Sequence, residues 1–164
     1  MKVKIPLRYI PNSLKKKDKK KQKRMLLKSR RLYKKGVYYT RKKVDSYPSK
    51  TSNHIMNARR IYKIDSIKPS KELAKATGCS LGSLEKIVRK GEGAYFSSGS
   101  RPNQTGQSWG IARLASAISS GKAAAIDYDI LEKGCDHNKK AFKLAIKSKK
   151  KYGYGHRKTK KVIL

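Results

Sequence analysis

Hydrophobic residues are sparse over the first 50 positions, and they take up helical spacing only in the second half of one long basic segment. Asn12 or Ser13 can cap a helix there, and Gly36 can end it. Its first turns, LKKKDKKKQKR, have no apolar face. The later turns supply a narrow apolar stripe: Met25, Leu26, Leu32 and Tyr33. Because like charges four residues apart oppose an isolated helix, we expect this helix to fray unless an anion neutralises it.

Two shorter patterns follow the basic helix. The stretch GVYYTRKKV, residues 36–44, is rich in β-branched and aromatic residues and predicts a short strand. Its Tyr38 and Tyr39 can stack on nucleic-acid bases or pack into a core. The stretch SNHIMNARRIYKI, residues 52–64, predicts a short helix. One side of that helix faces inward or along a partner: Ile55, Met56, Arg59 and Tyr62.

Residues 70–91 predict two helices joined by a tight turn. Ser70 can cap the first helix, and Gly78 supplies the left-handed residue that ends it. Ser80 can cap the second helix, which Gly91 ends. The inner faces of the two helices are apolar: Leu73, Ala74, Leu84, Ile87 and Val88.

The spacing of Ala74, Gly78 and Leu84 is that of a helix-turn-helix, although an ordinary helical hairpin fits it equally well. In a DNA reader the second helix offers these residues to the groove: Ser80, Gly82, Ser83, Lys86 and Lys90. No long base-reading side chain begins that helix. This absence disfavours sequence-specific reading.

A neutral stretch, SSGSRPNQTGQSWG, lies at residues 97–110. We interpret it as a turn-rich loop between a short strand, AYFS, and a helix that Ser108 caps and that runs to about Ser119. Trp109 should be buried as an anchor of that helix. Residues 122–131 alternate as a strand. The structural core predicted from all these patterns comprises Leu73, Ala74, Gly78, Leu84, Trp109 and Leu114.

The last part of the chain, residues 136–164, is again basic. It predicts an amphipathic helix with one apolar stripe: Ala141, Phe142, Ala145 and Ile146. Such a helix suits a membrane surface, a nucleic acid or a groove on a partner. The final VIL can add to a neighbouring strand or simply pack. The predicted fold class is mainly α with a small β component (α+β). A compact core at residues 51–135, which includes the loop, helix and strand of 94–131, carries long basic arms at 1–50 and 136–164.

Charge narrows the possible partners. The 164 residues include 44 Lys and Arg against 10 Asp and Glu, a net charge of +34. Residues 1–50 hold 20 of the basic residues and 2 acidic ones. A chain this cationic needs an anionic partner, which can be DNA, RNA, an anionic lipid surface or an acidic protein. No run reaches the roughly 20 apolar residues of a spanning helix, and the first residues lack a secretory pattern.

Three basic runs and the second helix of the hairpin supply the candidate anion- or nucleic-acid-binding residues. They are Lys15, Lys16, Lys19, Lys20, Lys23, Arg24, Arg30, Arg31, Arg41, Lys42, Lys43, Lys86, Lys90, Lys149, Lys150, Arg157 and Lys158.

No constellation predicts an enzyme or a cofactor. The neutral loop lacks the Gly-Lys-Ser/Thr ending of a phosphate-binding loop. Asp127 and Asp129 can hold a metal, or they can pair with arginines. Arg101 and Arg113 can form an anion pocket with the loop amides, or can hydrogen-bond loop carbonyls or these two aspartates.

Two cysteines are too few for a disulfide framework, which favours synthesis in the cytosol or nucleus. The set Cys79, Cys135, His137 and His156 matches a zinc site by number but not by spacing. We therefore predict no metal site.

The string GAYFSSGSRPNQTGQSWGIARLASAISSGKAAAIDYDILEKGC, with IKPSKELAKATGCS upstream, resembles an uncharacterised domain family of large double-stranded DNA viruses, notably those that infect algae. The resemblance covers most of residues 1–135, and SSGSRPNQT, SW and ARLASAI are its specific parts. The family has no assigned chemistry. The resemblance implies that this is a virus-encoded protein of the virus particle. Its partners would then be capsid proteins, packaged DNA or the internal membrane.

Together these features predict a non-enzymatic structural protein, a minor capsid protein on the inner side of the shell in a large assembly. The alternative is a DNA-binding or DNA-condensing protein of the particle with a helix-turn-helix-like element. A ribosomal protein fits the charge but not the resemblance.

Overall fold

The computed structural model describes residues 3–153 and 160–164 and divides the chain into two compact units. Unit 1 comprises Met1–Lys50, Glu92–Trp109 and Lys158–Leu164, and unit 2 comprises Thr51–Gly91 and Gly110–Arg157. This division differs from the predicted core with two arms. Residues 3–50 pack into unit 1 through their own buried side chains, and the C-terminal basic helix packs into unit 2.

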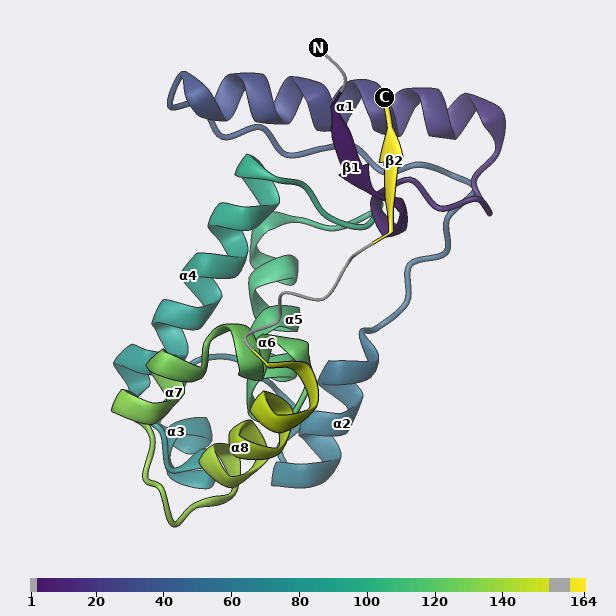
Figure 1. Cartoon of the computed structure of the whole chain (residues 1–164). Coiled ribbons are helices and arrows are strands. Elements are labelled where there is room, and N and C mark those ends of the chain that lie inside the picture. The colour runs from purple at the N-terminus through teal and green to yellow at the C-terminus, as the bar shows by residue number, and fades with distance from the viewer. Residues whose placement is uncertain (1–2, 154–159) are drawn as a thin grey trace. The chain divides into compact units, whose positions relative to one another are not determined.

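Unit 1 contains one long helix and a small sheet (Figure 1). Strand β1 (Lys4–Pro6) pairs antiparallel with β2 (Lys161–Ile163), and Ile5 lies opposite Val162. The final VIL therefore adds to a strand of its own chain. A 3₁₀ turn at Leu7–Tyr9 follows β1, and helix α1 spans Lys16–Lys34. Ile5, Tyr9, Ile10 and Leu26 form one small apolar cluster, and Leu14, Met25 and Val44 form another.

Within its described residues, unit 2 has helices as its regular elements, with a single antiparallel bridge between Cys79 and Cys135. Its elements are α2 (Asn53–Tyr62), α3 (Lys71–Thr77), most of α4 (Leu81–Ser97), most of α5 (Gly106–Ile118), α6 (Lys122–Ile126), α7 (Tyr128–Gly134) and α8 (Lys140–Tyr152). One continuous core includes Leu73, Leu84 and Leu114, all fully buried. The predicted fold class, mainly α with a small β component, is confirmed.

Helix ends were predicted well where a side chain makes the cap. Ser70 Oγ accepts from the Leu73 N–H, Ser80 Oγ accepts from the Ser83 N–H, and Gly78 is left-handed with φ +77°. The predicted caps of the other two helices are wrong. Lys15, which makes no side-chain cap, precedes α1. Thr105 Oγ1, rather than Ser108, caps α5 by accepting the Ser108 N–H.

Gly91 does not end α4, and the predicted strand AYFS is the last part of that helix. The glycine serves another purpose. A Cβ atom at Gly91 would lie 2.6 Å from the Cα of Gly110, so the two glycines let α4 and α5 approach closely. A glycine in a helix interior costs only about 1 kcal/mol, which this close packing offsets.

Two predicted strands are also wrong. Residues 122–131 form α6 and the start of α7, because Ala123, Ala124 and Ala125 favour a helix and all three are buried in it. Residues 36–44 form no regular element. Their backbone amides bond to side chains instead: the Arg41 N–H to the Tyr95 hydroxyl and the Val44 N–H to Asn103 Oδ1.

Candidate anion-binding surfaces

Helix α1 has a distinct inner face even though its first turns lack apolar residues. The buried positions recur at helical spacing: Asp18, Gln22, Met25, Leu26 and Ser29. The polar members make hydrogen bonds within unit 1. Gln22 Nε2 donates to the Tyr9 carbonyl at 3.1 Å, and Ser29 Oγ donates to the Phe96 carbonyl at 3.1 Å. Directional hydrogen bonds thus complement a short apolar stripe in docking α1.

Asp18 fixes the beginning of α1. Its carboxylate accepts the Ser46 backbone N–H at 2.8 Å and also the Ser46 hydroxyl. These two hydrogen bonds from Ser46 hold the pKa of Asp18 below its usual value, with Lys21 and Lys17 adding to the effect. A carboxylate in the first turn of a helix is also favoured by the helix dipole. Asp18 therefore ties the segment around Ser46 to α1.

The neutral loop at residues 97–105 encloses a buried arginine. The Arg41 guanidinium donates to Ser29 Oγ at 2.9 Å, to the Tyr95 carbonyl at 2.8 Å and to Ser100 Oγ at 2.8 Å. It also lies 3.8 Å from the centre of the Tyr95 ring. Burial lowers the pKa of Arg41. The prediction that Arg41 contacts an external anion needs correction, because its donors are engaged inside unit 1.

Asn103 and Gly99 let the neutral loop pack against neighbouring segments of unit 1. Asn103 accepts the Val44 N–H at 2.7 Å and donates to the carbonyls of Val44 and Tyr47. It has φ +63°, which Asn tolerates better than most residues. At Gly99, with φ +128°, a Cβ would lie 2.8 Å from a methyl group of Leu26. Small neutral residues are therefore needed where α1 and residues 41–47 meet this loop.

Trp109 is only partly buried, contrary to the prediction. It packs against the cluster of Ile5, Tyr9, Ile10 and Leu26, with its ring edge-to-face on Tyr9 at a centroid distance of 6.0 Å. The predicted core partner Leu114 belongs to the core of unit 2. Trp109 and Leu114 were both predicted to belong to one core, but they contribute to different clusters.

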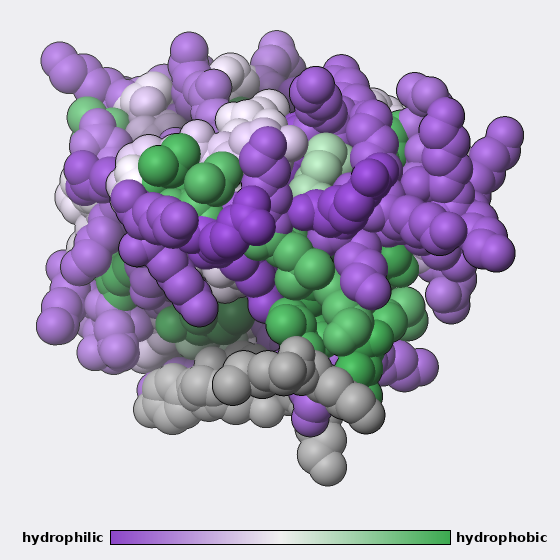
Figure 2. All heavy atoms as spheres, turned by 90° about the horizontal axis from the view of Figure 1, so that it is seen from above, coloured by the Kyte–Doolittle hydropathy of each residue, from purple (hydrophilic) through white to green (hydrophobic). Residues whose placement is uncertain are grey.

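The outer face of α1 is a cationic stripe. Its exposed basic residues are Lys16, Lys17, Lys20, Lys23, Arg24, Lys28, Arg31 and Lys34. Figure 2, which looks onto the side of α1, shows hydrophilic residues over most of this surface. Within the described residues, none of these eight side chains forms an ion pair with an acid. Unit 1 holds 24 Lys and Arg against three Asp and Glu, so most of its positive charge has no internal counterpart.

The other predicted basic residues of unit 1 differ in availability. Lys15, Lys42 and Lys43 are exposed, whereas Lys19 and Arg30 are partly covered. Arg30 Nε donates to the Ser98 carbonyl at 2.8 Å, so the loop also holds this side chain. Arg157 and Lys158 lie outside the described residues.

Helix α8 presents a second cationic face, on unit 2. Its inner side is close to the prediction, with Ala141, Phe142, Ala145 and Ser148 buried, while Ile146 is 36% exposed. The outer side repeats Lys at helical spacing: Lys140, Lys143, Lys147, Lys150 and Lys151. Lys149 is partly buried, with its ammonium 4.2 Å from the centre of the Tyr128 ring.

The α3–α4 pair has the spacing of a helix-turn-helix, but the first turn of α4 packs against the end of α7 within unit 2. The Ser80 N–H donates to the Gly134 carbonyl at 2.8 Å. A Cβ atom at Gly134 would lie 1.7 Å from Ser83 Oγ, so α7 ends directly against the first turn of α4. This geometry favours the ordinary helical hairpin. Of the predicted lysines, Lys86 is exposed and Lys90 pairs with Asp127 at 3.1 Å.

Asp127 is an ion-pair residue and not an open metal ligand. Its carboxylate is buried and accepts two hydrogen bonds of 2.8 Å from the Arg113 guanidinium, besides the contact with Lys90. Asp129 is exposed. The alternative in which Arg113 pairs with Asp127 is confirmed. Because its guanidinium bonds to Asp127, Arg113 does not form an anion pocket with Arg101.

The cysteines form a disulfide, Cys79–Cys135, so neither carries a thiolate for zinc. Two cysteines are too few for a disulfide framework, but they form this single link. His137 stacks on Phe142 at 4.0 Å, and His156 lies outside the described residues. The part of the chain that the structure describes contains no group of three or more metal-ligating side chains. Within the same residues, no helix is both long enough and apolar enough to cross a bilayer.

Comparison with known proteins identifies a family but no function. No curated protein and no solved structure matches the chain. Residues 6–141, which include α1, the neutral loop and the helices of unit 2 as far as the first residues of α8, match a family of unknown function. The chain belongs to this family, DUF5824.

Proposed function

We propose that the protein is a non-enzymatic structural protein of the particle of a large DNA virus, a minor capsid protein on the inner side of the shell. In this role its cationic helix faces bind acidic surfaces of other capsid proteins. The viral origin rests on the sequence resemblance described above. The binding role rests on the structure of α1.

The observation that carries the binding role is the pairing of two opposite faces on α1. Its inner face is fixed by hydrogen bonds that Gln22 and Ser29 donate and that Asp18 accepts. Its outer face presents eight exposed cations without an acidic partner in the described residues. A rigid stripe of charge suits one complementary acidic surface, because fixed geometry adds specificity to the long-range attraction.

DNA is the second candidate partner, favoured by the length of the same stripe. Nineteen residues of helix extend about 28 Å. That length matches about eight phosphates of one DNA strand at about 3.4 Å of axis per phosphate. Since a net charge of +34 binds any polyanion to some degree, affinity for free DNA does not separate the two candidates.

Location in the particle tests the proposal. Virus particles are stripped gently and separated into a shell fraction and a nuclease-sensitive DNA fraction. We expect the protein in the shell fraction. Recovery only with the DNA would contradict the capsid role and favour the second candidate.

Charge reversal on α1 tests which surface is used. The triple variant Lys20→Glu, Arg24→Glu and Lys28→Glu should be lost from assembled particles. A matched control, Lys68→Glu, Lys71→Glu and Lys75→Glu, reverses three exposed lysines of unit 2 and should still be incorporated. Equal incorporation of the two variants would contradict a role for the α1 stripe.

A further inference from the structure

A concave basic site lies within unit 1, separate from the face of α1. The cavity has a volume of about 500 Å³, within the range of small-molecule sites. Three cationic side chains line it, Arg8, Arg101 and Lys160, together with Asn12, Ser13 and Tyr47, and the lining contains no acidic residue. From this composition we propose that the cavity binds a phosphate monoester.

Arg101 is the strongest argument for a ligand. It is the one charged residue in the stretch 97–110. Its neighbours Ser100 and Pro102 are buried, so the backbone that carries Arg101 is held in place while the side chain is exposed. In the described residues Arg101 makes no ion pair with an acid. The loop therefore presents a single unpaired guanidinium to the cavity.

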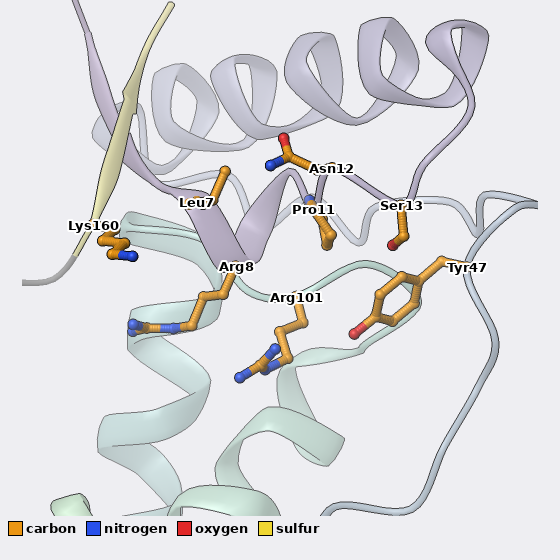
Figure 3. Close-up of a pocket in the computed structure, with 8 residues that line it drawn as sticks. All are labelled: Leu7, Arg8, Pro11, Asn12, Ser13, Tyr47, Arg101 and Lys160. Atoms are coloured by element: carbon orange, nitrogen blue, oxygen red, sulfur yellow. The ribbon is translucent and has the colours of Figure 1, made fainter.

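Arg8 adds a second guanidinium from a different segment. It lies 5.1 Å from the centre of the Tyr9 ring, a contact that restrains a long side chain. Figure 3 shows the side chains of Arg8 and Arg101 extending to the same side of the cavity. Two guanidinium groups with their planar sets of donors suit the oxygens of a phosphate better than they suit a monovalent anion.

The remaining lining explains why an ester fits better than phosphate alone. The hydroxyls of Ser13 and Tyr47 can hydrogen-bond further oxygens. Leu7, Pro11 and the ring of Tyr47 supply apolar surface for a compact organic group. A nucleoside monophosphate has this combination, either as the free nucleotide or as the phosphorylated end of a nucleic acid. The inference does not depend on the proposed capsid role.

Calorimetric titration of the full-length protein at 150 mM salt tests the site, with adenosine monophosphate as the probe and adenosine as the phosphate-free control. We expect saturable binding of one adenosine monophosphate and no binding of adenosine. Arg101→Ala and Arg8→Ala should each weaken binding at least tenfold. The matched control Arg89→Ala removes an exposed arginine of unit 2 and should change affinity less than twofold. Trp109 fluorescence and circular dichroism confirm folding of each variant.

A hexanucleotide with and without a 5′-phosphate distinguishes the two sources of the ligand. Tighter binding of the phosphorylated form, lost in Arg101→Ala, indicates a nucleic-acid end, whereas adenosine monophosphate binding without this difference indicates the free nucleotide. Equal weakening by Arg101→Ala, Arg8→Ala and Arg89→Ala would overturn the proposal, as would the absence of saturable adenosine monophosphate binding in the folded protein.

Discussion

The two units of this chain fold around different kinds of interior. Unit 2 buries 21 hydrophobic residues in one cluster, whereas the clusters of unit 1 contain four and three buried residues. Unit 1 is also the more cationic, with 24 Lys and Arg against three acids, compared with 20 against seven in unit 2. Unit 1 therefore has fewer buried apolar residues than unit 2 and a larger net positive charge to hold together.

Unit 1 compensates with buried hydrogen bonds centred on the neutral loop. Arg41, Asn103, Gln22 and Asp18 each join segments far apart in sequence. The lesson is that a highly basic segment can acquire a fixed structure when a small-residue loop supplies acceptors for it. The following predictions test this contrast, beginning with the largest expected effect.

Removing the buried guanidinium should destabilise unit 1 most. Arg41→Ala leaves the acceptors on Ser29, Tyr95 and Ser100 without their donor and opens a cavity, at a cost of about 3–5 kcal/mol. Trp109, the one tryptophan and a unit 1 residue, reports the change by fluorescence in guanidinium titrations. Lys42→Ala, at an exposed neighbouring side chain, should cost less than about 0.5 kcal/mol. Equal stability of the two variants would contradict the claim that the buried hydrogen bonds of Arg41 stabilise unit 1.

Breaking the disulfide should act on unit 2. Cys79 and Cys135 are 56 residues apart, and releasing a loop of that length costs about 4 kcal/mol in the chain-entropy account. Hydrogen exchange of α7 and α8 should accelerate in the double variant Cys79→Ala, Cys135→Ala. Reducing agent should have the same effect on the natural protein and none on the variant. Two free thiols in the untreated folded protein would contradict this link.

Asn103 combines a hydrogen-bonding role with a backbone role in the loop. Asn103→Ala loses three hydrogen bonds and places alanine at φ +63°, so we expect a loss of about 2 kcal/mol in unfolding free energy. Asn103→Gly loses the same bonds without the backbone strain and should be intermediate in stability. If the glycine variant matches the natural protein in the Trp109 titration, the hydrogen bonds of Asn103 contribute nothing.

Acid should weaken unit 1 through Asp18, with the smallest effect of the set. Because the pKa of Asp18 is lower in the folded protein, its contribution is present above the usual carboxylate pKa of about 4 and is lost as the pH falls through the folded-state value. The Asp18→Asn variant should therefore lose less unfolding free energy than the natural protein as the pH falls, measured by Trp109 fluorescence. If the variant and the natural protein lose the same unfolding free energy in acid, Asp18 is not the cause of that loss.

The sequence predicted helices best where local chemistry decides the outcome. Ser70, Gly78 and Ser80 act within a few residues of their own positions, and their roles were read correctly. Gly91 was misread as a stop, because its role depends on Gly110, which is distant in sequence. The segment at 122–131 alternates like a strand, but a strand needs a neighbour, and the three alanines are buried in a helix instead.

The candidate site was predicted only in part. Exposed lysines of α1 follow from the charge pattern, yet the same pattern gives no sign that Arg41 is buried among Ser29, Tyr95 and Ser100. The signal that could have been used is the neutral loop itself, whose Ser and Asn residues supply acceptors. The cavity at Arg101 draws its lining from residues 7, 8, 11–13, 47, 101 and 160, which no sequence window brings together.

Hydrogen exchange of α1 in the full-length protein at physiological salt, without any polyanion, tests the central claim most directly. If the inner face of α1 is docked by its own hydrogen bonds, amides of Gln22 to Ser29 should exchange at least about a hundredfold more slowly than in an unfolded chain. Exchange of these amides at the unfolded rate, with α4 and α5 still protected, would contradict the account and leave the basic segment ordered only by a partner.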